Sequence, residues 1–343
     1  MPTLDVMSLL SPNHLHRASP FLCTAVCRKE NTMAELEVCV ESLSSAKTAI
    51  QAGVTRIEVC SNLSQGGLTP SCGLVVALCN YLAERDDGTT AAKTTRTPSL
   101  FLMIRSRAGS DFVYTEDDMR TMVADVEVFQ SLRVQHPNTL GRFVKGVVFG
   151  ALAKDGSRLD ESAMEKILLA ASGSDSASPL EVTFHRAIDR LPSLEAMKAA
   201  LSTIVAVNEK VVEESSAKAV GQVTTILTSG GQSSAGSATA LVALNAMQHT
   251  CNGLNERKPM TIMAGGGVNS RNVESILATL HGASSHRATS SASPLRVHCS
   301  AKQNITAGTP PEDMQIVVDA EVVAKMVLLT STFAGSGGSG AKI

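Results

Sequence analysis

Two short segments of the sequence repeat a carboxylate and a thiol at the same spacing. The pattern Glu-Val-Cys occurs as Glu37 to Cys39 and again as Glu58 to Cys60. Alternate side chains of a β-strand share one face, so each glutamate lies on the same face as the cysteine two positions later. One helix-length segment separates the copies, and a strand–helix–strand unit would set the two strands side by side. The pattern therefore predicts two carboxylates and two thiols that converge on one site.

Further residues with chemical potential follow other short hydrophobic runs. They are Arg105, Arg107, His185, Ser229, Gly265, Gly266, Gly267 and His298. We expect Glu37 or Glu58 to act as a general base, and His185 or a second histidine to act as the acid. Plainer roles stay open: the cysteines could be small buried hydrophobes, Arg105 could only neutralise the glutamates, and His185 could be a hydrogen-bonded core histidine.

Three consecutive glycines offer backbone N–H groups to a ligand. Gly265 to Gly267 precede a helix that we expect to begin at Ser270. A helix N-terminus approached through glycine binds anions well. Ser229, with the glycines after it, would add a hydroxyl and more backbone donors. Together with the two arginines and His298, these groups predict a site for an anionic small molecule.

Strands alternating with helices must position these residues. The expected strands are 36–40, 56–60, 100–105, 145–150, 181–186, 223–229, 260–264 and 296–300. Capping residues mark the helix starts between them, at Ser42, Thr69-Pro70-Ser71, Thr115, Asp160, Ser193, Ser237, Ser270 and Asp319. This alternation predicts a single TIM-type (β/α)8 barrel, whose site lies at the carboxyl ends of the strands. The alternative, a doubly wound open sheet, would carry an early Gly-x-Gly-x-x-Gly motif that the sequence lacks.

The chain divides into three parts. We expect an N-terminal extension without fixed structure over residues 1–34, the barrel over 35–332 and a flexible Gly/Ser-rich tail over 333–343. Uneven spacing predicts surface insertions, all on the helix-to-strand side of the barrel, at 85–98, 136–142, 172–179, 208–222 and 282–294.

Composition argues against several classes of partner. The net charge is -2, no basic block occurs and Trp is absent, which argues against nucleic-acid binding. No run approaches the roughly 18 apolar residues of a membrane span, and the N-terminus lacks the hydrophobic region of a signal peptide. The 8 cysteines are too scattered for a disulfide framework. These features predict a cytoplasmic protein whose partner is a metal ion or a small molecule.

Several motifs together resemble those of the CutC copper-homeostasis family, in order, over about residues 35–330. The matching segments are Glu37–Ser42, Arg56–Ser71, Met103–Arg107, Asp111–Tyr114, Gly146–Gly150, Val182–Ala187, Leu227–Gly230, Met263–Val268 and His298–Ala301. The resemblance implies a TIM-type barrel, a role in copper handling and a homo-oligomer. In some family members two cysteines are thought to bind Cu(I), and they correspond to Cys39 and Cys60. Thiolates are soft ligands that select Cu(I).

The chain departs from the family pattern after the third strand. Ser106 stands where the family usually has proline, and the segment before Asp111 is one residue longer. We therefore expect this loop, with Arg107, to sit differently here.

Two functions follow from these observations. The first is a copper homeostasis protein that binds Cu(I) through Cys39 and Cys60, for buffering or trafficking. The second is a TIM-barrel enzyme that acts on an anionic, phosphorylated small molecule, with copper binding incidental or regulatory. Cu(I) titration of a variant without the two thiols separates them.

Overall fold

The structure is a computed structural model that describes residues 34–86, 97–174, 177–215, 219–254, 260–284, 294–301 and 317–333. The predicted N-terminal extension and C-terminal tail lie outside these ranges, apart from Ala34 and Phe333. Within the described ranges, no helix combines the length and the apolar character needed to cross a membrane.

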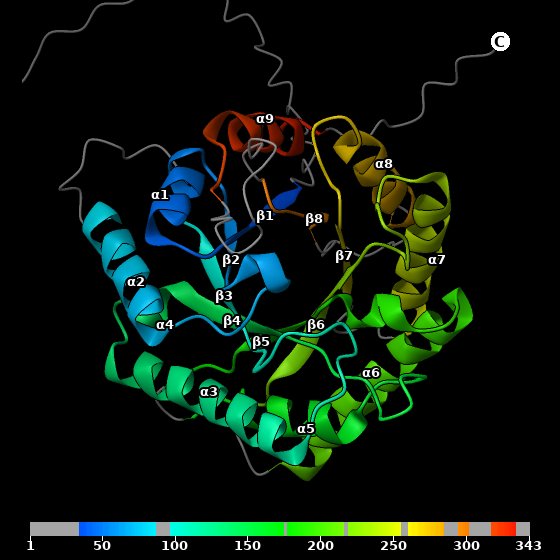
Figure 1. The fold of residues 1–343 in the computed structure, drawn as a ribbon, viewed down its shortest axis with the longest axis horizontal. Helices are drawn as coiled ribbons and strands as arrows, with labels where there is room; N and C mark the ends of the chain where they lie inside the picture. Colours follow the sequence, from blue (N-terminus) through cyan, green and yellow to red (C-terminus); the bar gives the residue numbers. More distant parts are fainter. Residues whose placement is uncertain are drawn as a thin grey trace, which may run out of the picture. The chain divides into compact units, whose positions relative to one another are not determined.

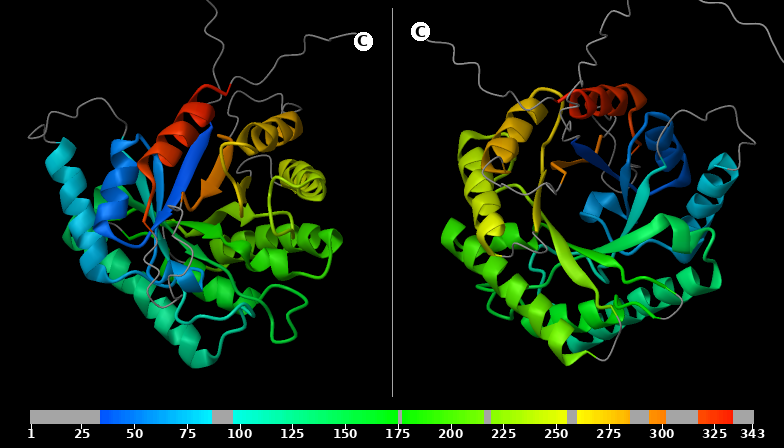
Figure 2. Two further views of the ribbon diagram at one scale, coloured as in Figure 1. Left: turned by 45° about the horizontal axis from the view of Figure 1, so that its top comes forward. Right: turned by 180° about the vertical axis from the view of Figure 1, so that it is seen from behind.

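A closed barrel of parallel strands forms the centre of the described residues, and neighbouring strands follow in chain order (Figure 1). The strands are β1 (Glu35–Val40), β2 (Arg56–Val59), β3 (Ser99–Met103), β4 (Val144–Phe149), β5 (Glu181–Phe184), β6 (Gln222–Thr228), β7 (Thr261–Gly265) and β8 (Arg296–Cys299). The main helices are α1 (Leu43–Gln51), α2 (Cys72–Asp86), α3 (Glu116–Gln135), α5 (Glu161–Ala170), α6 (Leu194–Glu214), α7 (Ala238–Leu254), α8 (Val273–Ser284) and α9 (Ala320–Ser331). The helices surround the strands on the outside, as Figure 2 shows from two further sides. The predicted TIM-type (β/α)8 barrel is confirmed.

Side-chain caps set most helix starts where the sequence predicted them. Ser42, Asp160 and Ser193 each accept a hydrogen bond from the backbone N–H three residues later. Thr115 forms a reciprocal capping box with Asp118. These bonds satisfy N–H groups that have no partner within the helix, so the start position follows from a local pattern.

Three expectations about element boundaries were wrong. Helix α8 begins at Val273 rather than Ser270, because Asn269 and Asn272 close a turn in which Val273 N–H donates to the Asn269 carbonyl. The segment 136–142 is no plain surface insertion, because it leads into the short helix α4 (Leu140–Phe143), whose two end residues are buried. Helix α6 extends to Glu214, inside the expected insertion 208–222.

The apolar core lies between the strands and the helices. Leu36 and Val38 point outward from β1 into this core, whereas Glu37 points into the barrel, where it is fully buried. Burying each such leucine or valine contributes roughly 1.5–3 kcal/mol. The barrel can therefore carry polar side chains inside, because its stability comes largely from the outer layer.

Two arginines, the buried Arg56 and the partly buried Arg296, fill the lower interior of the barrel. Arg56 Nε donates to Glu37 Oε2 at 2.6 Å, and its guanidinium stacks 3.2 Å from the centre of the Phe101 ring. Arg296 Nε donates to Glu35 Oε2 at 2.8 Å. Each arginine also donates to a threonine hydroxyl across the barrel. Paired charges rather than aliphatic side chains thus hold the layer beneath the candidate site.

The register between β1 and β2 offsets the two Glu-Val-Cys motifs. Glu37 pairs with Arg56, and Cys39 pairs with Glu58. Each residue of the first motif therefore lies two positions lower in the barrel than its counterpart in the second. Cys39 lies beside a carboxylate rather than beside Cys60.

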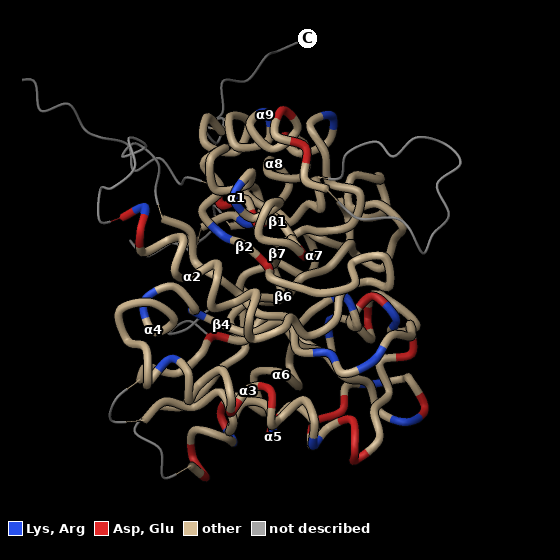
Figure 3. The backbone as a smooth tube through the Cα atoms, turned by 60° about the vertical axis from the view of Figure 1, so that its left-hand side comes forward, with Lys and Arg blue, Asp and Glu red and all other residues tan. Residues whose placement is uncertain are grey.

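Charged residues of both signs are interspersed over the outer helices (Figure 3). Three buried charged residues, Arg56, Glu37 and Glu58, lie on the barrel strands β1 and β2. The interior of the barrel and its open end are therefore where a ligand would meet buried charged groups.

Candidate functional site

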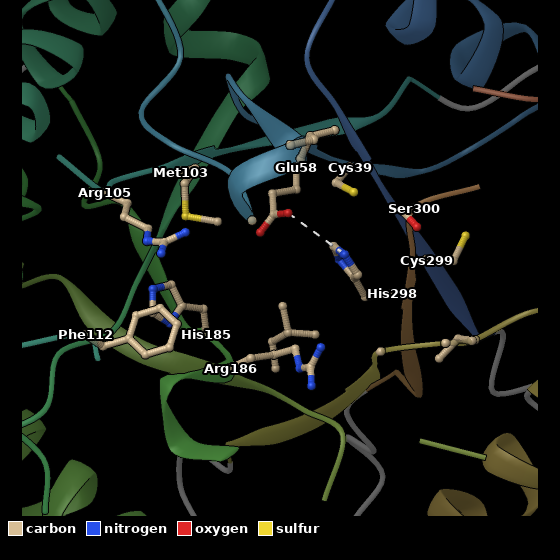
Figure 4. Close-up of a pocket in the computed structure, with 16 residues that line it drawn as sticks. Cys39, Glu58, Met103, Arg105, Phe112, His185, Arg186, His298, Cys299 and Ser300 are labelled. Carbon is tan, nitrogen blue, oxygen red and sulfur yellow. Dashed lines mark ion pairs between the residues drawn. The ribbon is translucent and has the colours of Figure 1, made fainter. Parts of the chain in front are cut away.

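A cavity of about 310 Å³ opens at the carboxyl ends of the strands. Its lining includes residues from both Glu-Val-Cys strands and from the ends of β3, β5, β7 and β8 (Figure 4). We call Cys39, Glu58 and His298 the thiol side of this cavity. Arg105, Phe112, His185 and Arg186 form the arginine side, which Figure 4 shows facing Cys39 and His298 across the opening.

The thiol side brings together three groups that can hold a metal ion. One ligand atom each from Cys39, Glu58 and His298 lies within 4.8 Å of the others. The three residues come from β1, β2 and β8, which are adjacent in the closed barrel. This is the grouping of candidate metal ligands found among the described residues, and it includes Cys39 but not Cys60.

His298 is held by a buried glutamate. Its Nδ1 lies 2.8 Å from Glu37 Oε1, and its Nε2 lies 3.9 Å from Glu58 Oε2. Burial lowers the pKa of His298, but Glu58, Cys39 and Glu37 outweigh burial and hold that pKa well above its ordinary value. Burial also raises the pKa of Glu37, yet Arg56 and His298 reverse this and lower it to about 2. Glu37 therefore stays ionised and fixes the imidazole with Nε2 toward Glu58 and Cys39.

Glu58 has a different environment. Burial, assisted by the charge on Glu37, raises the pKa of Glu58 to about 7 despite the attraction of His298. Its Oε2 accepts a hydrogen bond from Cys60 Sγ at 3.6 Å, while Oε1 has no hydrogen-bond partner among the described residues. A carboxyl with a pKa of about 7 and one oxygen without a described partner can accept a proton, or a hydrogen bond from a ligand.

Cys60 does not line the cavity and lies behind residues that do. It is fully buried in a small apolar cluster with Phe101, Met103 and Val148. Gly67 covers it: a methyl group at that glycine, whose φ is +87°, would lie 3.2 Å from Cys60 Sγ. Burial and then Glu58 raise the pKa of this thiol well above its ordinary value. Of the two thiols expected to meet, Cys39 therefore lines the cavity and Cys60 does not.

Arg105 anchors the arginine side. Its Nη1 donates to the carbonyls of Gln65 and Gly67, both at 3.1 Å, and its Nη2 donates to the carbonyl of Gly109. It forms no ion pair with any carboxylate that the structure describes, and its Nε has no partner there. The charge of Arg105 is therefore buried without an opposing anion.

His185 presents a donor to the same cavity. Its Nδ1 accepts a hydrogen bond from the Ala187 backbone at 3.1 Å, so the proton of the neutral ring lies on Nε2. Burial, and then Arg105, lower the pKa of His185 to about 3, which keeps the ring neutral. Nε2 has no partner among the described residues. The Phe112 ring packs against this ring at a tilt of 55°, with the ring centroids 5.0 Å apart. The backbone of Phe112 has a left-handed φ of +53°, a conformation uncommon outside glycine.

Other predicted site residues lie away from the cavity lining. Arg107 pairs with Asp111 at 3.1 Å and Asp118 at 3.4 Å in the loop after β3. Gly265 belongs to β7, where a methyl group would clash with Leu227, whereas Gly266 and Gly267 do line the cavity. The helix expected to begin at Ser270, directly after these glycines, begins at Val273 instead.

The donors after β6 are already used by a side chain of the chain itself. The Asp189 carboxylate accepts hydrogen bonds from Ser229 N–H at 3.0 Å, Ser229 Oγ at 2.9 Å and Gly231 N–H at 3.1 Å. Ser229 is fully buried and does not line the cavity. The predicted anion cradle at Ser229 is thus filled by Asp189.

Sequence reasoning overlooked Arg186 as a site residue. Its Nε donates to Asp189 at 2.8 Å and its Nη2 to Ser229 Oγ at 3.0 Å, while the guanidinium borders the cavity. Its place directly after His185, at the end of β5, was the signal that could have identified it.

Comparisons with known proteins agree on one family. The CutC family model matches residues 34–291. A copper homeostasis protein cutC homolog from Dictyostelium discoideum is 33% identical over 244 residues, covering 71% of this chain and 77% of the relative. The human protein of the same description is 31% identical over 242 residues, covering 71% and 68%. A crystal structure of a candidate copper homeostasis protein, CutC, from Streptococcus agalactiae superimposes with a TM-score of 0.55 at 25% identity, covering 78% of this chain and 99% of that one.

Proposed function

Because the chain belongs to the CutC family, we propose that it binds Cu(I) in the cavity at the carboxyl ends of the strands, for copper homeostasis in the cytoplasm. Its relatives from Dictyostelium discoideum and human are described as copper homeostasis proteins. The observation that carries the proposal is the Cys39 thiol, which lies with the His298 imidazole and the Glu58 carboxylate within 4.8 Å. Copper would be buffered or passed on, not consumed.

The donor set suits Cu(I) in part. A thiolate and an imidazole are ligands that copper accepts, whereas a carboxylate is a harder ligand that favours other ions. The ligands must lose their protons, so copper would compete with the protons on Cys39 and His298. The resemblance to the family implies that Cys60 is a second ligand. To reach the ion, its thiol must leave Glu58 Oε2.

The test is an anaerobic Cu(I) titration of the reduced protein against a competing chelator. We expect one tight site in the wild type, and its loss in the double variant Cys39→Ser, Cys60→Ser. His298→Gln should weaken it, whereas Cys72→Ser, which removes an exposed thiol on α2, is the matched control. Stoichiometric binding retained in the double variant would contradict the proposal.

A second candidate function is an enzyme that acts on an anionic, phosphorylated small molecule. It is favoured by three buried atoms that have no hydrogen-bond partner among the described residues and belong to residues that line the cavity: Glu58 Oε1, Arg105 Nε and His185 Nε2. In this version Glu58 takes a proton and the other two hold the substrate. A screen of phosphorylated and carboxylated metabolites with Glu58→Gln as the inactive control tests it. Turnover unchanged in that variant would remove the assigned role.

A further inference from the structure

The thiol side is short of soft ligands. Cys39 is the thiol of the ligand grouping, and Glu58 supplies a hard oxygen. Cys299 also borders the cavity, but it belongs to the main apolar core cluster and is not part of that grouping. Met103 borders the cavity but packs with Cys60 in the buried apolar cluster. Soft sulfur ligands select Cu(I), so a site with one available thiolate gains from a second sulfur brought by another molecule.

The arginine side has hydrogen-bond donors that lack acceptors. Arg105 Nε and His185 Nε2 are donors without acceptors among the described residues, and both residues are 4% exposed. The half-exposed Arg186 adds a second positive charge, only part of which Asp189 balances. Buried donors and charges are costly without partners, so this side is suited to an anion.

The number and kind of donors favour a carboxylate over a phosphate. Arg105 and His185 each offer one unpartnered N–H, which is the number a carboxylate with two oxygens can use, and Arg186 borders the same cavity. A phosphate is usually held by several backbone N–H groups, and Asp189 already occupies those of Ser229 and Gly231. The cavity of about 310 Å³ is at the small end of ligand pockets, which limits the ligand to a small molecule.

We propose that this cavity receives Cu(I) as its complex with a small carboxylate-bearing thiol, the carboxylate held by Arg105, His185 and Arg186 and the sulfur sharing the ion with Cys39. This inference rests on the proposed copper function and names the form in which the ion arrives. In the exchange, a Cu–S bond to one small thiolate breaks as the bond to Cys39 forms. The proton of Cys39 leaves with the displaced thiolate, and copper remains Cu(I).

Three thiols of similar size but different charge test the proposal. Anaerobic chelator competition is run with 3-mercaptopropionate, neutral 2-mercaptoethanol and cationic cysteamine, on wild type, Arg105→Gln and Arg186→Gln. Each thiol's own affinity for Cu(I) cancels in the ratio of wild type to variant. We expect copper retention to fall about tenfold in either variant with 3-mercaptopropionate and to stay unchanged with 2-mercaptoethanol, in line with the loss of one charge-assisted hydrogen bond.

Two controls keep the outcomes distinct. Arg120→Gln removes an exposed arginine on α3 and should change nothing with any thiol. Arg105 also donates hydrogen bonds to the carbonyls of two loops, so Arg105→Gln could lower stability; Arg186→Gln and a thermal melt of each variant control for this. NMR saturation transfer between propionate and the copper-free protein measures anion binding without copper. Equal ratios for all three thiols, with copper still bound, would overturn this inference alone. Absence of Cu(I) binding with every thiol would overturn the copper function and this inference together.

Discussion

The two Glu-Val-Cys strands carry the same residues, yet the barrel gives them opposite environments. Glu37 is ion-paired on both oxygens, to Arg56 and His298, whereas Glu58 keeps one oxygen without a described partner. Cys39 borders the cavity, and Cys60 is packed behind it. For the glutamates the difference follows from the two-residue offset in the strand register, which sets Glu58 beside Cys39 and Glu37 beside Arg56. For the thiols it follows from Gly67 and the apolar cluster that cover Cys60. The same local motif therefore acquires different environments from its tertiary neighbours.

The largest contrast is expected in stability. Glu37→Gln leaves the Arg56 charge buried without its partner, so it should lower the free energy of unfolding by about 3–5 kcal/mol at pH 7. Glu58→Gln resembles the protonated form of a carboxyl whose pKa is about 7, so we expect a change below about 1 kcal/mol at pH 5, where Glu58 is protonated and Glu37 is still ionised. Urea denaturation measures both. Equal losses in the two variants would show that the carboxylates are equivalent.

The two thiols should differ next in copper affinity. Cys39→Ser is expected to weaken Cu(I) binding about 100-fold, or about 2.7 kcal/mol, and Cys60→Ser less than tenfold. The reason is that Cys39 already borders the cavity, while Cys60 must leave its bond to Glu58. Chelator competition on the single variants gives the ratio. Equal losses would mean that both thiols bind the ion and that the segment covering Cys60 moves on loading.

The two glutamates should also respond to pH in opposite directions. The pKa of Glu37 is lowered to about 2, so its stabilising contribution is present above pH 4.5 and is lost as the pH falls toward 2. The pKa of Glu58 is raised to about 7, so its contribution is present below pH 4.5 and is lost as the pH rises to 7.

Glu58→Gln should therefore gain stability relative to wild type, by about 3 kcal/mol, between pH 4.5 and 8. Denaturation curves at a series of pH values measure this gain, and Glu37→Gln should show no such rise over the same interval. A flat difference for Glu58→Gln would mean that the carboxyl ionises normally in the folded protein.

The smallest expected effect concerns the cover over Cys60. Gly67→Ala places a methyl group 3.2 Å from Cys60 Sγ on a backbone with φ of +87°, and should cost about 1 kcal/mol of stability. Combining it with Cys60→Ala should recover the part due to contact and leave the part due to the backbone. A double variant no more stable than Gly67→Ala would assign the whole cost to the backbone.

Local patterns were sufficient to predict the barrel, because hydrophobic runs and caps such as Ser42 and Thr115 act within a few residues. They also identified the side chains of the thiol side. The offset between the two motifs could not be predicted, because strand register depends on closure of the whole barrel. The role of Ser229 was equally beyond reach, since its donors are taken by Asp189, 40 residues away in the chain.

The Asp189 carboxylate also bears on how this fold changes function over evolutionary time. An acceptor held by the chain itself, in the segment after β5, is present at a very high effective concentration beside the loop after β6, so dissolved phosphate competes poorly for the same N–H groups. A single substitution at Asp189 that removes the carboxylate would leave those N–H groups without this acceptor, in a loop that contacts Arg186 at the border of the cavity.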